Sequence, residues 1–317
     1  EFALLNPNTL TCPVFRSAQD AQITAKIYSR VPVLIEEAKR EGEQDKNPWG
    51  ISFKQGLFNM TSDAGLFHAS PAPDRLPLYE AKMIHQADHR WATYAAVGSG
   101  SAANGPSGGE SGEADACRDV TDAEKADPGF TVRPRYWVDR RQVLARISRA
   151  PRSLIKAWLA KDAADLREEL SLCMEDEELL AVGGKKYAEA EELFAAVEAV
   201  LEARSPRWLM GWRDITNATN ERTVIASVVP RVGVGHTMPL VITSQSVLLQ
   251  TCFFANLNGL CTDYIARLKV GGTHLTYSYL KQFAILPPDT YQASDLSFIV
   301  PRVLELTYTA WDMEAWA

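Results

Sequence analysis

The chain lacks any apolar run near the ~20 residues that a membrane-spanning helix needs, and its start shows no signal peptide. It also lacks a CxxC pair. Its five cysteines are scattered, at Cys12, Cys117, Cys173, Cys252 and Cys261. An odd number at such spacings argues against a disulfide framework or a zinc ribbon and favours a reducing compartment. We therefore expect a cytoplasmic protein with no membrane partner.

A strong overall charge is also lacking, because the net charge of −7 is concentrated in one place. Residues 154–204 hold 13 Asp and Glu against 6 Lys and Arg, a balance of −7. The remainder then has 40 − 13 = 27 acids and 33 − 6 = 27 bases, so it is neutral. A locally basic face, which binding to nucleic acid would need, is thus compatible with the total.

The 317 residues are 46% hydrophobic and 23% charged, a globular composition whose length suggests about two domains. Residues 208–242 are rich in predicted strands, of which Thr223–Val229 is β-branched. Helical periodicity covers 20–31, 155–180, 185–204, 246–266 and 298–316. These patterns predict a mixed α/β (α+β) fold.

The expected organisation has four parts. The first is an N-terminal part that joins a missing domain. A recognition domain follows in two pieces, separated by an acidic helical hairpin whose helices meet at Gly183-Gly184. Low complexity at about 98–116 predicts a mobile loop within the first piece. The boundaries are 1–75, 76–153, 154–204 and 205–317.

The stretch LPLYEAKMIHQADHRWATY, residues 76–94, combines aromatic, histidine and charged side chains in a way that neither plain surface nor plain core does. Two metal-site hypotheses follow from it. His85 and His89 would share one face of a helix, although a zincin would have Glu where this chain has Gln86. Pro73-Asp74 followed by Glu80 and Lys82 resembles the PD…ExK pattern of Mg²⁺-dependent nucleases, with a short gap.

Basic residues also gather elsewhere. Lys269, Thr273, His274 and Lys281 surround Gly271-Gly272, where backbone N–H groups could approach a phosphate. The full GxxxxGK[ST] and GxGxxG patterns are absent, so no nucleotide loop is predicted. Arginine is frequent at 140–152. Further arginines occur at 213, 222 and 231, where pairing across strands and contact with DNA are equally open.

Seven segments occur in an order that resembles the C-terminal part of large bacterial DNA N6-adenine methyltransferases. They are NPNTLTCPVFRS, NPWGISF, LPLYEAKMIHQADHRWATY, VRPRYWV, WLMGWRDITNATNERTVIASVVPRVGVGHTMPL, FANLNGLCTDYIARLKVGGTHLTYSYLKQFAILPP and IVPRVLELTYTAWDM. The enzymes are the restriction–modification and phage-defence methylases of the type IIG, BREX and DISARM kinds. The sixth segment is similar to the closing motif of TaqI-type specificity domains, so the resemblance implies a target-recognition domain with a mixed sheet.

Two motifs that the resemblance leads us to expect are missing from this sequence. Adenine methylation needs an Asn/Asp-Pro-Pro-Tyr/Phe element for the flipped base, and Asn6-Pro7-Asn8 and Asn47-Pro48-Trp49 do not fit it. The glycine-rich S-adenosylmethionine loop is missing too. The chain begins at Glu1 without methionine, and we expect a non-catalytic fragment without cofactor or metal. An N-terminal methyltransferase domain would bind S-adenosylmethionine and supply the adenine-specific chemistry.

The partners implied are double-stranded DNA, that methyltransferase domain and other subunits of a defence system. Lysine and arginine would contact phosphates, and a few side chains would read base edges. The candidates are Lys82, His85, His89, Arg90, Arg222, Arg231, His236, Lys269, Thr273, His274 and Lys281. Two alternatives stay open: a Mg²⁺ nuclease at Asp74, Glu80 and Lys82, and a protein-interaction module that docks a partner through residues 154–204.

Overall fold

A computed structural model of the chain describes residues 5–11, 15–94 and 116–317. The predicted mobile loop at about 98–116 lies outside these ranges except for its last residue. Helices and both antiparallel and parallel strand pairs are present, which confirms a mixed α/β fold. Among the residues described, no helix combines the length and the apolar character needed to cross a membrane.

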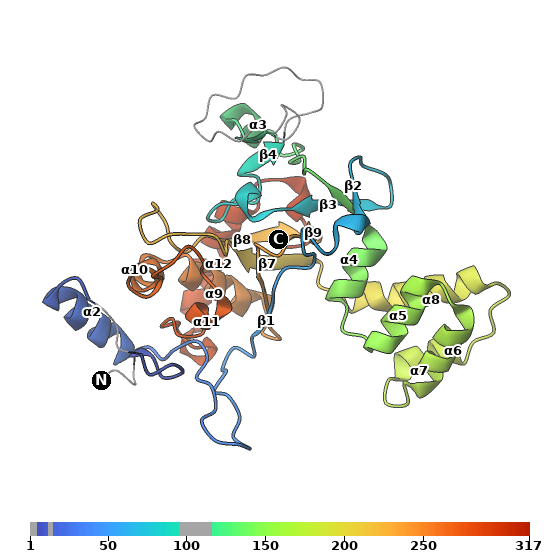
Figure 1. Ribbon diagram of the computed structural model, residues 1–317, viewed down its shortest axis with the longest axis horizontal. Coiled ribbons are helices and arrows are strands. Elements are labelled where there is room, and N and C mark those ends of the chain that lie inside the picture. Colours follow the sequence, from blue (N-terminus) through green and yellow to red (C-terminus); the bar gives the residue numbers. More distant parts are fainter. Residues whose placement is uncertain (1–4, 12–14, 95–115) are drawn as a thin grey trace.

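An antiparallel sheet of four strands lies at the centre of the molecule (Figure 1). Its strands, in spatial order, are β1 (Ser52–Lys54), β10 (Leu240–Ile242), β7 (Trp208–Trp212) and β8 (Ala226–Pro230). Because side chains alternate along a strand, Met210 and Trp212 enter one core while Leu209 enters another. Hydrophobic layers therefore cover both faces of the sheet, as the run of buried residues at 223–229 predicts.

A second sheet packs across one of these layers. Its strands, in order, are β2 (Phe67–His68), β6 (Trp137–Asp139), β3 (Arg75–Tyr79) and β9 (Gly233–Val234). The pair β3–β9 is parallel and the others are antiparallel. A Cβ atom on Gly233 would lie 2.6 Å from Val138 Cγ2, so the close packing of β9 requires glycine there. A separate antiparallel pair is formed by β4 (Ala92–Tyr94) and β5 (Cys117–Asp119).

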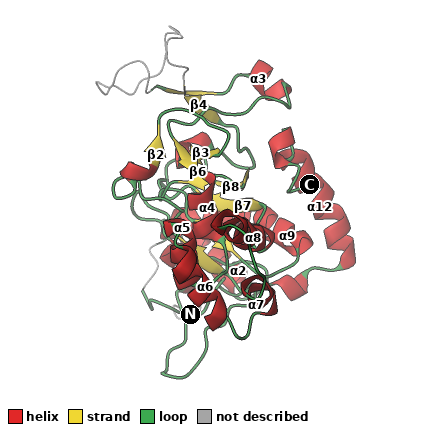
Figure 2. Ribbon diagram, turned by 90° about the vertical axis from the view of Figure 1, so that its right-hand side faces the viewer, coloured by secondary structure: helices red, strands yellow, loops and turns green. Residues whose placement is uncertain are grey.

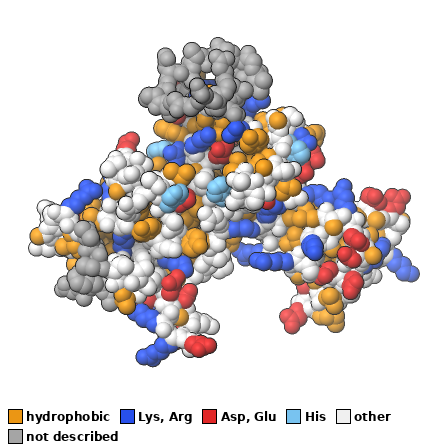
Figure 3. Space-filling model, viewed as in Figure 1, with side chains coloured by type: hydrophobic (Ala, Val, Ile, Leu, Met, Phe, Trp, Pro, Cys, Tyr) orange, Lys and Arg blue, Asp and Glu red, His pale blue; other side chains and the backbone are white. Residues whose placement is uncertain are grey.

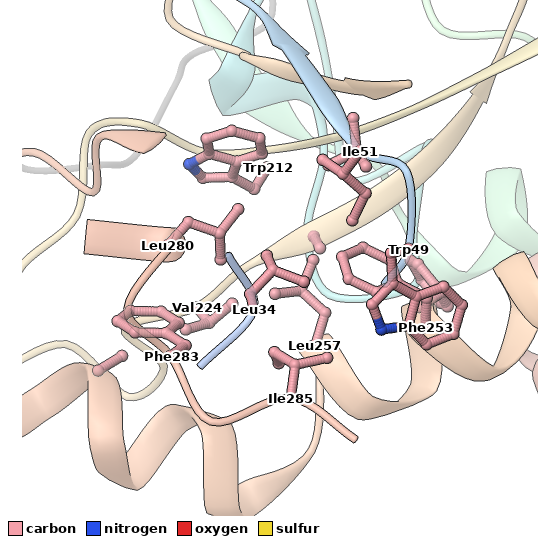
Figure 4. Close-up of a cluster of buried hydrophobic side chains, with 14 of the residues drawn as sticks. Leu34, Trp49, Ile51, Trp212, Val224, Phe253, Leu257, Leu280, Phe283 and Ile285 are labelled. Atoms are coloured by element: carbon pink, nitrogen blue, oxygen red, sulfur yellow. The ribbon is translucent and has the colours of Figure 1, made fainter. Parts of the chain in front are cut away.

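Helices cover the opposite face of the central sheet, and their core is drawn in Figure 4. The helices are α9 (Val247–Leu257), α10 (Leu260–Lys269), α11 (Tyr277–Leu280) and α12 (Ala293–Thr307), whereas α2 (Ala18–Tyr28) lies to the side (Figure 1) and contributes Tyr28 to the same core. In this core the indole ring of Trp49 meets Phe253 edge-on at 5.2 Å, and its N–H donates to the Leu286 carbonyl. Trp212 likewise donates to the carbonyl of Leu275, so both buried indoles are satisfied.

The acidic segment forms four helices with a core of their own, rather than the predicted hairpin. These are α5 (Arg152–Ala160), α6 (Ala163–Leu172), α7 (Glu177–Gly183) and α8 (Ala190–Ala203). The helix α4 (Arg140–Ile147) connects them to the body, because Leu144 joins their core and Val143 joins that of the second sheet. We call α5–α8 the helical unit. It projects from the body in Figure 1 and faces the viewer in Figure 2.

Other predicted elements are shorter or divided. The helix predicted from Asp20 begins at Ala18 under a Ser17 cap, the strand pair at 47–60 is β1 alone, and the strand at 130–138 is β6 alone. Residues 246–266 form two helices, because Asn258 leaves the helix and hydrogen-bonds both ways with the backbone of Ala226. The remaining short helices are η1 (Ala64–Leu66), η2 (Ala81–Met83), α3 (Asp122–Ala126), η4 (Pro288–Thr290) and η5 (Trp311–Met313).

Candidate nucleic-acid interface

Two of the predicted DNA contacts, His89 and Arg90, are inside the protein. Each side chain is 1% exposed, so neither can reach DNA in this structure, and the prediction is corrected for both. His89 shares a hydrogen bond of 3.0 Å between its Nε2 and Asp312 Oδ1. The Arg90 guanidinium donates to four backbone carbonyls, including that of Thr309 at 2.7 Å. Both residues join the stretch 76–94 to the C-terminal segment.

Three more predicted contacts are engaged with the protein itself. The Lys269 ammonium donates to the Leu5 carbonyl at 2.5 Å and to Asn6 Oδ1 at 2.6 Å, and burial lowers its pKa to about 7. Lys281 pairs with Glu37 at 2.5 Å, and Arg231 pairs with a carboxylate oxygen of Glu202 at 2.5 Å. The predicted cluster around Gly271-Gly272 is therefore reduced to Thr273 and His274, a correction that separates Lys269 and Lys281 from it.

Five of the predicted residues lie on segments that are hydrogen-bonded to Arg213 and Asp214, the two residues that follow β7. We call this set the β7-end surface: Lys82, His85, His236, Thr273 and His274.

Arg213 fixes one side of the β7-end surface. Its Nε donates to the carbonyls of Ala81 and Ile84, at 2.9 and 2.8 Å, and its Nη2 donates to that of Lys82 at 3.2 Å. The segment that carries Lys82 and His85 is thereby held against β7. Burial lowers the pKa of the Arg213 guanidinium, although a shift from so high a value leaves it charged at neutral pH.

Asp214 fixes the other side. Its carboxylate accepts from His274 Nδ1 at 2.9 Å, its backbone N–H donates to the carbonyl of Thr237, beside His236, and its carbonyl accepts from Leu275 N–H. Three segments that are far apart in the chain are thus tied to two consecutive residues. Figure 3 shows histidine side chains at several places on the face that it draws, some of them beside charged side chains.

The groups of the β7-end surface suit contact with nucleic acid. The side chains of Lys82 and His274 are 50% and 55% exposed, and Lys82 Nζ also lies 3.7 Å from a carboxylate oxygen of Glu80. The His85 ring packs against that of Trp91 at a tilt of 33°, with centroids 4.4 Å apart. Burial, and then the charge of Arg213, lowers the pKa of His85. A neutral imidazole offers one donor and one acceptor, and hydroxyl and ammonium groups can reach base edges or phosphates.

Two other observations concern Arg222 and the Gly271-Gly272 turn. One guanidinium nitrogen of Arg222, Nη1, is buried and finds no hydrogen-bond partner among the residues that the structure describes. A hollow of about 430 Å³ lies beside the Gly271-Gly272 turn, with Arg16, Arg267 and Thr273 in its lining. A Cβ atom on either glycine would meet nothing within 4 Å, so packing does not require glycine there.

The metal-site hypotheses are not supported by the geometry. Asp74 directly precedes β3 and Glu80 directly follows it, which separates their Cα atoms by roughly 20 Å at the usual rise per residue. They cannot hold one Mg²⁺ ion together. His85 and His89 lie in a turn where Ala87 has φ 60°, not on a helix. Within the described ranges, no group of three or more His, Cys, Asp or Glu side chains could hold a metal ion.

Arg213 holds the candidate site together and is not among the residues that the sequence analysis singles out for it. Its position among several arginines in the strand-rich stretch did not distinguish it, because its role comes from carbonyls some 130 positions earlier in the chain. Comparisons of the chain with protein-family models, with curated proteins and with solved structures found no match.

Proposed function

We propose that the chain recognises DNA as the non-catalytic region of an adenine-specific methyltransferase of a restriction–modification or phage-defence system. One observation carries the proposal. Three of the sequence segments that resemble such enzymes meet at the β7-end surface, which takes residues from 82–85, 236 and 273–274. Each contributes a side chain that can donate a hydrogen bond and that is at least partly exposed.

In this proposal Lys82 contacts a phosphate, and the imidazole and hydroxyl groups of His85, His236, Thr273 and His274 read base edges. The duplex is positioned so that a separate N-terminal domain, which binds S-adenosylmethionine, can extrude and methylate an adenine. The chain itself has no catalytic role. The setting is cytoplasmic, and further subunits of the defence system are proposed partners.

The test starts by selecting duplexes from a random library with the full chain. Affinities for the selected duplex and for a scrambled one are then measured by fluorescence anisotropy. In the double variant K82Q/H274Q, loss of His274 should lower the affinity ratio between the two duplexes about fivefold or more, since a good base contact contributes about 1–3 kcal/mol of discrimination. Loss of Lys82 should weaken the binding of both duplexes alike. The control is K39Q/R40Q, in an exposed loop where the side chains are 56% and 85% exposed.

Three results would count against the proposal: no duplex is enriched or bound, binding does not depend on salt, or K82Q/H274Q discriminates as the wild type does. Cleavage of plasmid with Mg²⁺ would revive the nuclease alternative despite the separation of Asp74 and Glu80.

A further inference from the structure

A basic cleft lies where the helical unit joins the body. It is a cavity of about 470 Å³ between β1, β7 and β10 on one side and the two connections to the helical unit on the other. No Asp or Glu is among the residues that line it, whereas five are basic: Lys54, Arg146, Arg149, Arg204 and Arg207. Figure 3 shows Lys and Arg side chains in the gap between the body and the helical unit. We call this cavity the arginine cleft.

Of these five side chains, Arg146 and Arg204 have carboxylate partners, whereas Arg149 and Arg207 have none in the described chain. Arg204 pairs with Asp176 and Glu178, and Arg146 lies 3.6 Å from a carboxylate oxygen of Asp63. Arg149 and Arg207 are exposed, and neither has an ion pair or hydrogen bond with any part of the chain that the structure describes. The cleft thus keeps a surplus of positive charge that the fold does not use.

Lys54 adds to this surplus from within. Its ammonium donates to the backbone carbonyl of Arg146, and burial lowers its pKa, with further contributions from the charges of Arg146 and Arg152. Like charges held this close raise each other's electrostatic energy, and an anion between them would lower it. The first turn of α9 also lines the cleft, through Val247 and Gln250, and brings the positive end of its dipole.

The position of the cleft relates it to the β7-end surface. Trp208 at the start of β7 lines the cleft, and Arg213 follows the other end of that strand. Five residues of strand span about 17 Å, which equals about five nucleotide steps at 3.4 Å each along one strand of DNA. The acidic helical unit lies beyond the cleft and repels a polyanion. The arginines are therefore at the edge of the surface that DNA can contact.

We propose that the arginine cleft holds the phosphodiester backbone of DNA a few nucleotides from the bases that the β7-end surface reads. This inference rests on the proposed function and deepens it, by separating where the backbone is held from where sequence is read. Arg149 and Arg207 contact phosphates, which positions the duplex without reading its sequence.

The test uses the full chain and the double variant R149Q/R207Q, with K39Q/R40Q as the control. Each lost phosphate contact should reduce the slope of log affinity against log salt by about 0.9, so the double variant should lose about 2 from the slope. At 0.1 M salt, its affinity should fall at least about tenfold for selected and scrambled duplexes alike. The affinity ratio between the two should stay unchanged, unlike that of K82Q/H274Q. An unchanged melting temperature shows that the variant is folded.

The outcomes separate the two proposals. If the wild type selects a sequence while R149Q/R207Q keeps its affinity and salt slope, the cleft inference is refuted and the proposed function stands. If the wild type binds no duplex, the proposed function fails and the inference falls with it. If R149Q/R207Q abolishes binding of inorganic pyrophosphate but leaves DNA binding intact, the cleft is a site for a small anion and the inference is also wrong.

Discussion

Replacement of Arg90 is the perturbation whose outcome the structure fixes most tightly. This guanidinium is 1% exposed and has no carboxylate partner within the described chain. Its N–H groups donate instead to the carbonyls of Lys125, Asp127, Phe130 and Thr309, at 2.7–3.1 Å. The four carbonyls come from two segments, so one side chain connects the turn at 88–91 to α3 and to the C-terminal segment.

The magnitude follows from the bonds that are lost. A hydrogen bond to a charged group contributes about 1.5–3 kcal/mol, and a buried carbonyl left without a donor costs about 1–3 kcal/mol. Because these terms overlap, we expect Arg90→Met to lower the free energy of unfolding by about 4 kcal/mol or more. Arg90→Lys retains the charge but not the planar fork, and we expect it to recover only part of the loss.

The assay is thermal unfolding followed by circular dichroism, with urea unfolding as a second measure. At about 2 °C per kcal/mol for a chain of this size, Arg90→Met should melt about 8 °C or more below the wild type. The control is Arg40→Met, whose side chain is 85% exposed and which should melt within about 1 °C. If Arg90→Met melts with the wild type but loses affinity for DNA, the residue is a DNA contact after all and our reasoning is wrong.

Three further predictions concern packing and ionisation. Trp158→Ala should destabilise the helical unit by about 3–5 kcal/mol in hydrogen exchange, because the ring is fully buried, whereas Leu172→Ala, 67% exposed, should change little. Gly233→Val should lower the melting temperature because its Cβ would meet Val138, and Gly271→Ala, with open space, should not; equal effects would contradict this packing. Lys269 has a pKa of about 7 when folded and near 10.4 when unfolded, so the unfolded state binds more protons between these values. The stability of the wild type should therefore rise by about 2 kcal/mol from pH 7 to pH 9 relative to Lys269→Met, and parallel pH profiles would refute the shift.

Much of the fold follows from the order of polar and apolar residues. The strands in 208–242 and the last helix of the helical unit match the predicted ranges, since alternation and helical spacing repeat over enough residues to be seen. The sequence does not predict the break between α5 and α6. Lys161 ends α5 in a left-handed conformation, φ 56°, without the glycine that usually marks such an end. Apolar periodicity continues on both sides of it and suggests one helix.

The site was harder to predict, because a charge is visible in sequence but its partner is not. His85 and His89 look equivalent as letters, yet one packs half-buried against Trp91 and the other is enclosed beside Asp312, 223 positions later. Lys269 was selected for its glycine neighbours and points instead to Leu5. Arg149 belongs to the arginine-rich run at 140–152, which is visible in the sequence. Arg207 lies near it only because the chain, after the helical unit, comes back to the same side of the body.

The two basic regions differ in what supports them, and this sets what each can do for binding. Arg213 and Asp214 hold the β7-end surface through bonds to several segments, so its side chains keep defined positions, as reading base edges requires. Arg149 and Arg207 are exposed and have no partner in the described ranges, which suits attraction to a backbone whose charge is the same at every step. Since sites without shared partners contribute almost additively, combining K82Q/H274Q with R149Q/R207Q should give the sum of their separate losses in discrimination and in salt dependence. Strong coupling between them would mean that one surface, not two, meets the DNA.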